Sequence, residues 1–168
     1  VYRRADSLHV GDMNEAVTSH FTRMLALNPY FNQRIDMTMC LDVEGPDGGV
    51  WLVDFRGPGS VRRGKVDDDC QYRDRFHSRW LKRILTGQVP WEDFLLSLRF
   101  SAYRDPDIYN DHLLGLLKFN DAASLRAIEV FEKRETHESI VVAADDGSRY
   151  EIARYCPHAG AALDNAPI

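Results

Sequence analysis

The stretch from Arg34 to Phe55, RIDMTMCLDVEGPDGGVWLVDF, constrains the fold more than any other part of the chain. Its first half alternates between two kinds of residue: the apolar ones are Ile35, Met37, Met39, Leu41 and Val43, and the others are Asp36, Thr38, Cys40 and Asp42. A period of two predicts a half-buried antiparallel strand with Cys40 on its polar face. The letters EGPDGG predict a turn, and VWLVDF predicts the returning strand. We therefore expect a β-hairpin here.

Helices and weaker strands surround this hairpin. Helices are predicted at residues 12–29, 76–87, 91–98, 105–119 and 121–134, and weaker strands at residues 61–65, 70–76 and 99–103. Asp12 and Asp121 are suited to cap the first and last helices, and Asp105, followed by Pro106, is suited to begin the fourth. Strands and helices that follow one another without strict βαβ alternation indicate an α+β fold, an antiparallel sheet with covering helices.

The pattern changes near Glu135. Residues 139–156, SIVVAADDGSRYEIARYC, are two apolar runs around Asp-Asp-Gly, which is typical of a hairpin. The shift from helix to strand predicts two domains, residues 1–134 and residues 135–168.

Composition excludes several classes of protein. The net charge of -5 disfavours binding to a nucleic-acid backbone. No apolar run approaches the roughly 18–20 residues that span a bilayer, so no membrane span is expected. Three cysteines at long, irregular spacings favour a reducing, cytoplasmic location over a disulfide framework. A chain that starts with Val1 is expected to be a fragment of a longer protein.

The layout of residues 70–117 carries a resemblance to a known family. A strand leads into a short helix that ends in ILTG, and a second short helix, a strand and a closing apolar helix follow. Together with the earlier elements, residues 12–118 resemble the sterol-carrier-protein-type fold. The resemblance implies a tunnel for a lipid or another hydrophobic small molecule. Met37 and Met39 could line such a tunnel, because thioether side chains repack easily, but a strand face of this kind is more often plain core.

Other polar clusters give weaker signals. Asp67, Asp68 and Asp69 lack the spacing of a calcium loop, so a solvated loop is the better interpretation. The histidines form no H-x-H or H-E-x-x-H motif, and no phosphate-binding or nucleophile-elbow motif occurs. Cys40 has no basic partner near it in sequence, so nothing supports a reactive thiol there. No catalytic residue is therefore assigned.

The segment YCPHAGAAL, residues 155–163, places Cys156 and His158 two residues apart in a loop. A thiolate and a neutral imidazole both suit iron. The segment, together with the hairpin before it, resembles the first half of a Rieske [2Fe–2S] site, in which a C-x-H pair is followed by a C-x-x-H pair. The resemblance implies that residues 135–168 are the start of a small all-β Rieske domain and that Cys156 and His158 are ligands of the cluster. No C-x-x-H follows, so two of four ligands are missing; a zinc site and a chance C-x-H pair remain alternatives.

A sterol-carrier-like domain before a Rieske domain resembles bacterial proteins that are similar to CMP-N-acetylneuraminate hydroxylases, which join a metallo-β-lactamase-type fold to a Rieske centre. The leading hypothesis is a fragment of an iron–sulfur oxidoreductase. Its partners would be an electron donor and an upstream catalytic domain of the same polypeptide, and a C-x-x-H is expected within about twenty residues after Ile168. The first alternative is a module that binds a hydrophobic ligand without catalysis. The second is an interaction scaffold.

Overall fold

The computed structural model describes residues 8–133, 138–156 and 162–164. The chain divides into two compact units, Val1–Leu125 and Arg126–Ile168, and each is described here by itself. The predicted domain boundary after residue 134 stays a prediction. Within the described residues, no helix is long and apolar enough to cross a membrane, and the cytoplasmic location stays a prediction.

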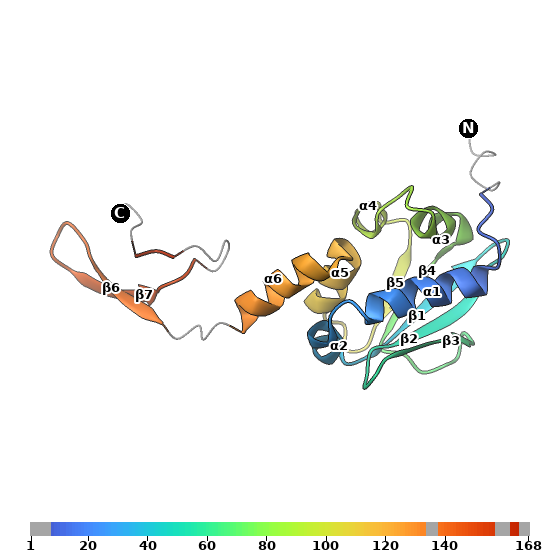
Figure 1. The fold of residues 1–168 in the computed structure, drawn as a ribbon, viewed down its shortest axis with the longest axis horizontal. Coiled ribbons are helices and arrows are strands. Elements are labelled where there is room, and N and C mark those ends of the chain that lie inside the picture. Colours follow the sequence, from blue (N-terminus) through green and yellow to red (C-terminus); the bar gives the residue numbers. More distant parts are fainter. Residues whose placement is uncertain (1–7, 134–137, 157–161, 165–168) are drawn as a thin grey trace. The chain divides into compact units, whose positions relative to one another are not determined.

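The first unit is a five-stranded sheet with helices (Figure 1). Its strands are β1 (Thr38–Glu44), β2 (Gly49–Asp54), β3 (Ser60–Gly64), β4 (Tyr72–His77) and β5 (Ser101–Arg104), in the spatial order β3-β2-β1-β4-β5. The helices are α1 (Met13–Leu25), α2 (Pro29–Ile35), α3 (Ser78–Leu85), α4 (Trp91–Leu96) and α5 (Asp111–Phe119), and α6 (Ala122–Glu132) spans the division between the units. The α+β class is confirmed.

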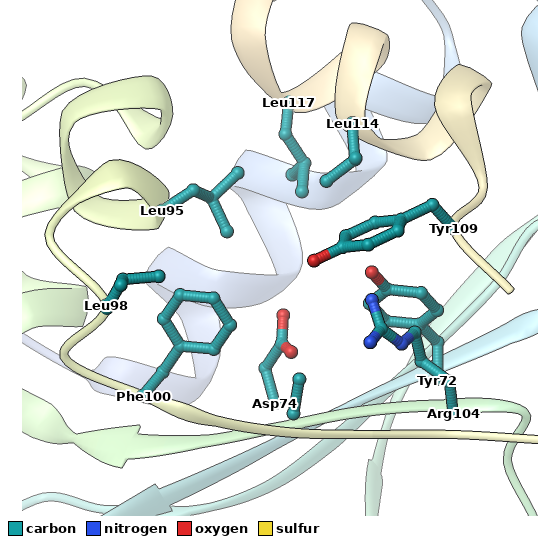
Figure 2. A pocket seen from close by; sticks show the side chains of 10 residues that line it. Tyr72, Asp74, Leu95, Leu98, Phe100, Arg104, Tyr109, Leu114 and Leu117 are labelled. Carbon is teal, nitrogen blue, oxygen red and sulfur yellow. The ribbon is translucent and has the colours of Figure 1, made fainter. Parts of the chain in front are cut away.

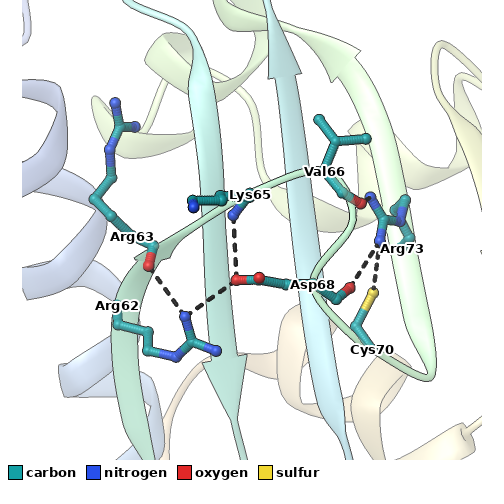
Figure 3. Close-up of polar contacts among 7 residues, drawn as sticks. All are labelled: Arg62, Arg63, Lys65, Val66, Asp68, Cys70 and Arg73. Carbon is teal, nitrogen blue, oxygen red and sulfur yellow. Dashed lines mark hydrogen bonds and ion pairs between the residues drawn. The ribbon is translucent and has the colours of Figure 1, made fainter.

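One strand pair departs from the expected antiparallel sheet. β1 runs parallel to β4, with Leu41 opposite Asp74, while the other three pairs are antiparallel. The reason is the connection after β3. Residues 65–71 carry the chain from the edge of the sheet across one of its faces to the far side of β1 (Figure 3). A crossover of this kind brings the next strand in parallel, whereas a tight hairpin cannot.

The prediction that β1 is half-buried is wrong. Residues 38–43 are all buried, and Cys40 is fully enclosed. On one face Trp51 of β2 donates a hydrogen bond from Nε1 to Asn14 Oδ1 of α1, 3.1 Å away, so this face carries helices. On the opposite face Cys40 packs in a cluster with Val50, Leu52 and Cys70, under residues 65–71. A strand covered on both sides buries its polar positions too.

Two helix boundaries also differ from prediction. Ile35 ends helix α2 and does not begin the strand. Asp105 and Pro106 lie in the connection after β5, and α5 begins later, at Asp111. Asn110 caps α5, because its Oδ1 accepts from the backbone N–H of Leu113 at 2.8 Å. Its amide also donates to the carbonyl of Ile35, 3.2 Å away, which fixes the helix start against α2.

The caps at Asp12 and Asp121 are confirmed. Asp12 accepts from the N–H of Glu15 at 2.9 Å, and Asp121 accepts from the N–H of Ser124 at 2.9 Å. These contacts satisfy backbone donors in the first turn of each helix, which otherwise have no partner inside the helix.

The second unit contains the predicted hairpin. β6 (Ser139–Ala143) pairs antiparallel with β7 (Arg149–Ala153), and Gly147 turns the chain at a φ of 82°. An isolated bridge joins Tyr155 to Ala162 after the hairpin. Every residue of β7 is exposed.

Candidate binding pocket

A pocket of about 200 Å³ lies in the first unit, over the β4–β5 side of the sheet (Figure 2). Its walls come from β4, the end of α4, β5, the connection that follows and α5. The lining residues are Tyr72, Asp74, Leu95, Leu98, Phe100, Ala102, Arg104, Tyr109, Leu114 and Leu117.

Every second side chain of β4 lies on the face of the sheet that carries this pocket. Tyr72, Asp74 and Phe76 are buried, whereas the intervening Arg73 and Arg75 are more exposed. Since successive strand residues point to opposite faces, the first three share the helix-covered face. Phe76 packs on Phe94 of α4, with ring centroids 4.9 Å apart, so only Tyr72 and Asp74 are left to line the hollow.

Helix ends place two further walls. α4 ends at Leu96, and Leu98 follows in the left-handed region with a φ of 53°. That conformation is usual for glycine after a helix, and a leucine there costs roughly 1–2 kcal/mol. Leu98 is nevertheless 79% exposed and lines the pocket. The cap at Asn110 places Leu114 and Leu117 of α5 over the same space.

Asp74 is the unusual member of the set. It is 1% exposed, and among the described residues neither of its carboxylate oxygens has a hydrogen-bond partner. Figure 2 shows the carboxylate pointing into the hollow, between Phe100 and the side chains of Tyr72 and Arg104. Burial raises the pKa of Asp74 to about 7, and the positive charge of Arg104 opposes part of that rise.

Arg104 is engaged by other groups. Its Nε donates to Asp107 Oδ1 at 3.1 Å, and its guanidinium lies 4.1 Å from the ring centroid of Tyr109. Hydrogen bonds to the hydroxyls of Tyr109 and Tyr72 raise the pKa of Arg104 above its ordinary value. Burial is the largest influence on Tyr72, whose pKa is also raised. The pocket thus has a polar end at Asp74, Arg104 and the tyrosines, and an apolar end.

The structure describes only one of the two predicted cluster ligands. Cys156 is a free, partly buried cysteine three residues after β7, and His158 lies outside the described residues. Across the described ranges there is no group of three or more His, Cys, Asp and Glu side chains that could hold a metal. Of the predicted ligand pair the described residues contain Cys156 alone, whereas a [2Fe–2S] cluster requires four ligands. Cys156 and His158 as iron ligands stay a prediction.

The aspartate run belongs to the crossing segment (Figure 3). Asp68 accepts from Arg62 Nη1 at 3.2 Å and from the N–H of Lys65 at 3.2 Å, while Asp67 and Asp69 are exposed. Arg73 of β4 donates to the carbonyls of Val66 and Asp68. The loop interpretation fits these contacts, since the aspartate's partners are the protein's own cations and amides.

Cys40 is buried and does not lie on a polar strand face, whereas Met39 is plain core, as the strand pattern favoured. Burial, with a smaller contribution from Cys70, raises the pKa of Cys40 to about 12, so its thiol is protonated and inert at neutral pH. Met39 is fully buried, and neither Met37 nor Met39 lines the pocket.

Reasoning from sequence missed the polar end of the pocket. The letters YRDRF of β4 alternate between a buried and an outer set, which would have placed Tyr72 and Asp74 on one face. The sequence does not indicate that Asp74 has no hydrogen-bond partner among the described residues. It also does not indicate that Tyr109 and Arg104 line the same pocket as Asp74, because the three residues come from separate elements.

No protein-family model and no curated protein matches the chain. Similar solved structures include sterol carrier protein 2 from Yarrowia lipolytica in its apo form, at 10% identity and a TM-score of 0.41, covering 58% of this chain and 85% of that chain. Sterol carrier protein 2 like 2 from Aedes aegypti has 16% identity and a TM-score of 0.45, with 57% and 88% covered. The sterol carrier protein domain 2 of Helicoverpa armigera has 13% identity and a TM-score of 0.36, with 66% and 78% covered.

The sterol-carrier-like resemblance of residues 12–118 stays a prediction. With identities below 25% and TM-scores below 0.5, these likenesses carry no inference about a ligand. The Rieske and hydroxylase resemblances stay predictions. The pocket of the first unit is the feature that bears on what this unit binds.

Proposed function

We propose that the first unit binds a small, mainly apolar molecule in the pocket between β4, β5, α4 and α5. The observation that carries this proposal is a hollow walled mostly by leucines and aromatic rings, with a few convergent polar groups at one end. Ligand sites commonly combine apolar walls with a few placed polar groups. The strained Leu98 adds support, since a costly backbone conformation is retained where a side chain serves a site.

The volume limits the ligand. A dry cavity of about 150 Å³ holds benzene, whereas the pockets that bind drug-sized molecules measure about 300–1,000 Å³. At about 200 Å³ the pocket fits a substituted benzene or the end of an acyl chain. A whole sterol is too large for a pocket of this volume. A lipid-carrier role would therefore require only part of the lipid to enter the pocket.

Pocket filling provides the test. 2-Phenylethanol would be titrated while the methyl signals of the lining leucines are followed by NMR. Ala102 lies opposite Asp74 in the β4–β5 ladder, so Ala102→Leu adds bulk beside the carboxylate. Ser101→Leu makes the same change on the other face of the strand. We expect saturable shifts in the wild type and in Ser101→Leu, and a loss of at least tenfold in affinity in Ala102→Leu. Equal binding by both variants would contradict the proposal.

A fluorescent fatty-acid probe tests the lipid role separately. Displacement of the probe by micromolar fatty acid from the wild type, but not from Ala102→Leu, would support a lipid role in which the acyl end enters the pocket and the carboxylate stays away from Asp74. Lack of probe binding at micromolar concentration would reject a lipid-carrier role and leave the small-molecule site standing.

We propose as a second candidate that Cys156 and His158 hold one side of a [2Fe–2S] cluster in a longer protein. One observation favours it: a partly buried free cysteine lies three residues after the end of β7. Iron and sulfide analysis of the chain extended past Ile168 is the test, with His158→Ala as the comparison. An extended protein free of iron after anaerobic reconstitution would reject it.

A further inference from the structure

The pocket contains a buried carboxylate that the described protein residues leave unsatisfied. Asp74 is 1% exposed, and both its oxygens are without hydrogen-bond partners in the described chain. Buried polar groups are nearly always paired, and each exception calls for an explanation. Because the carboxylate points into a cavity (Figure 2), a ligand can provide the missing donors.

The residues around Asp74 do not provide these donors in the observed arrangement. Arg104 directs its donors to Asp107 and to the hydroxyls of Tyr72 and Tyr109. The other walls are apolar: α4 and the residues after it contribute Leu95, Leu98 and Phe100, and α5 contributes Leu114 and Leu117. Leu41 is the β1 residue opposite Asp74. The titratable and charged groups around Asp74 are therefore Tyr72, Arg104, Tyr109 and, through Arg104, Asp107.

We propose that the pocket recognises a small amphipathic amine, with its protonated amino group on Asp74 and its apolar body against the leucines. The assignment rests on the proposed binding function and adds the class of ligand. An ammonium carries three donors, enough for both oxygens, and a charge that compensates the carboxylate. The ring of Phe100 lies beside Asp74 and adds to the apolar wall (Figure 2).

Ligands with other head groups meet this site less well. A carboxylate places a second negative group beside Asp74, and the guanidinium of Arg104 already directs its donors to Asp107 and the two tyrosine hydroxyls. An alcohol provides one donor and no charge, so it leaves one oxygen unpaired. The order of affinity expected at pH 8 is amine, then alcohol, then carboxylate.

The protonation of Asp74 gives the amine a distinct pH dependence. Burial puts the pKa of this carboxyl at about 7, so it is mainly neutral at pH 6 and mainly ionised at pH 8. An ammonium binds the ionised form, and its affinity is expected to rise about tenfold between these values. A carboxylate ligand would show the opposite trend, and an alcohol little change.

The experiment compares three ligands that share a phenyl group and a short chain: 2-phenylethylamine, 2-phenylethanol and 3-phenylpropanoate. Dissociation constants would be measured by calorimetry or NMR at pH 6 and pH 8. Asp74→Asn removes the charge. Asp42→Asn is the matched control, since Asp42 is also buried but pairs with Arg75 at 2.7 Å on the other face. We expect Asp74→Asn to weaken amine binding at least tenfold and alcohol binding less than threefold.

The outcomes separate the two proposals. If the alcohol binds the wild type and the amine binds no more tightly, the pocket function stands and the amine assignment falls. Unchanged amine affinity in Asp74→Asn also overturns the assignment. If none of the three ligands binds, both proposals fall. Should Asp74→Asn fail to fold, the pH dependence of the wild type decides, because flat or falling amine affinity from pH 6 to pH 8 contradicts the assignment.

Discussion

Two hairpins with similar local patterns have different surroundings in this chain. β1–β2 and β6–β7 are both antiparallel pairs joined by turns that contain glycine. Residues 38–43 of β1 are all buried, with helices over one face and the crossing segment under the other, whereas every residue of β7 is exposed. A hairpin by itself is marginally stable in water, and further strands or a packed helix make it firm. Alternation in sequence thus predicts a strand without predicting its burial.

The largest expected difference in stability between the two hairpins comes from truncating one apolar side chain in each. Leu41→Ala in β1 removes a fully buried side chain and should lower the free energy of unfolding of the first unit by about 2–5 kcal/mol. Val141→Ala in β6, where the side chain is 65% exposed, should change stability by less than about 0.5 kcal/mol.

Urea unfolding followed by tryptophan fluorescence measures the first unit, because Trp51, Trp80 and Trp91 all lie in it. Amide hydrogen exchange at β6 and β7, resolved by NMR, follows the hairpin of the second unit. Similar losses in the two variants would break the comparison.

The two units also differ in how they shift the pKa of an aspartate. Burial raises the pKa of Asp74 from 3.8 to about 7, whereas hydrogen bonding by Ser148 lowers the pKa of Asp146 in the turn of the second hairpin. The folded state holds the Asp74 proton more tightly than the unfolded state does, so the contribution of Asp74 to the stability of the first unit falls as pH rises from about 4 to 7. Asp74→Asn should remove this loss and gain roughly 2–4 kcal/mol at pH 8.

The measurement is unfolding of wild type and Asp74→Asn from pH 4 to pH 8. His20, whose pKa is lowered from 6.5 to about 4 mainly by burial, acts in the opposite sense between about pH 4 and pH 6.5, but both proteins share it. The difference between them therefore isolates Asp74. Asp146→Asn should leave the tryptophan-detected transition unchanged across this range. A constant difference between wild type and Asp74→Asn would show that Asp74 ionises normally.

Long-range ties are a third point of difference. In the second unit, Arg154 pairs with Glu138, 16 positions away. In the first unit, Asn110 caps α5 and also bonds to Ile35, 75 positions away. Asn110→Ala should cost the first unit about 1–2 kcal/mol, whereas Asn110→Asp keeps the cap and should cost less. Equal losses in the two variants would assign the whole effect to the bond with Ile35.

The smallest expected effect concerns positive φ. The turn of the second hairpin uses Gly147, but the pocket uses Leu98. Leu98→Gly should relieve strain but lose chain entropy, for a net change in stability of about 0.5 kcal/mol or less. Binding of 2-phenylethanol should weaken by a measurable factor. Unchanged affinity, measured by the same NMR titration, would show that Leu98 does not serve the pocket.

The sequence by itself determined most of the local structure. Alternation predicted β1 and β2, the caps at Asp12 and Asp121 predicted two helix starts, and Asp-Asp-Gly predicted the second hairpin, because each depends on a few neighbouring residues. Asp105 was the wrong start for α5, because the bond from Asn110 to Ile35 depends on residues far apart in the chain.

Only the tertiary structure decided what covers the sheet and where the pocket lies. The crossing segment made β1 parallel to β4 and buried Cys40, and separate elements brought Tyr109 and Arg104 to Asp74. Burial and long-range packing are properties of the assembled chain. The partner that Asp74 lacks among the described residues cannot be read from its neighbours in sequence, since it depends on which other elements arrive there and what they leave unfilled.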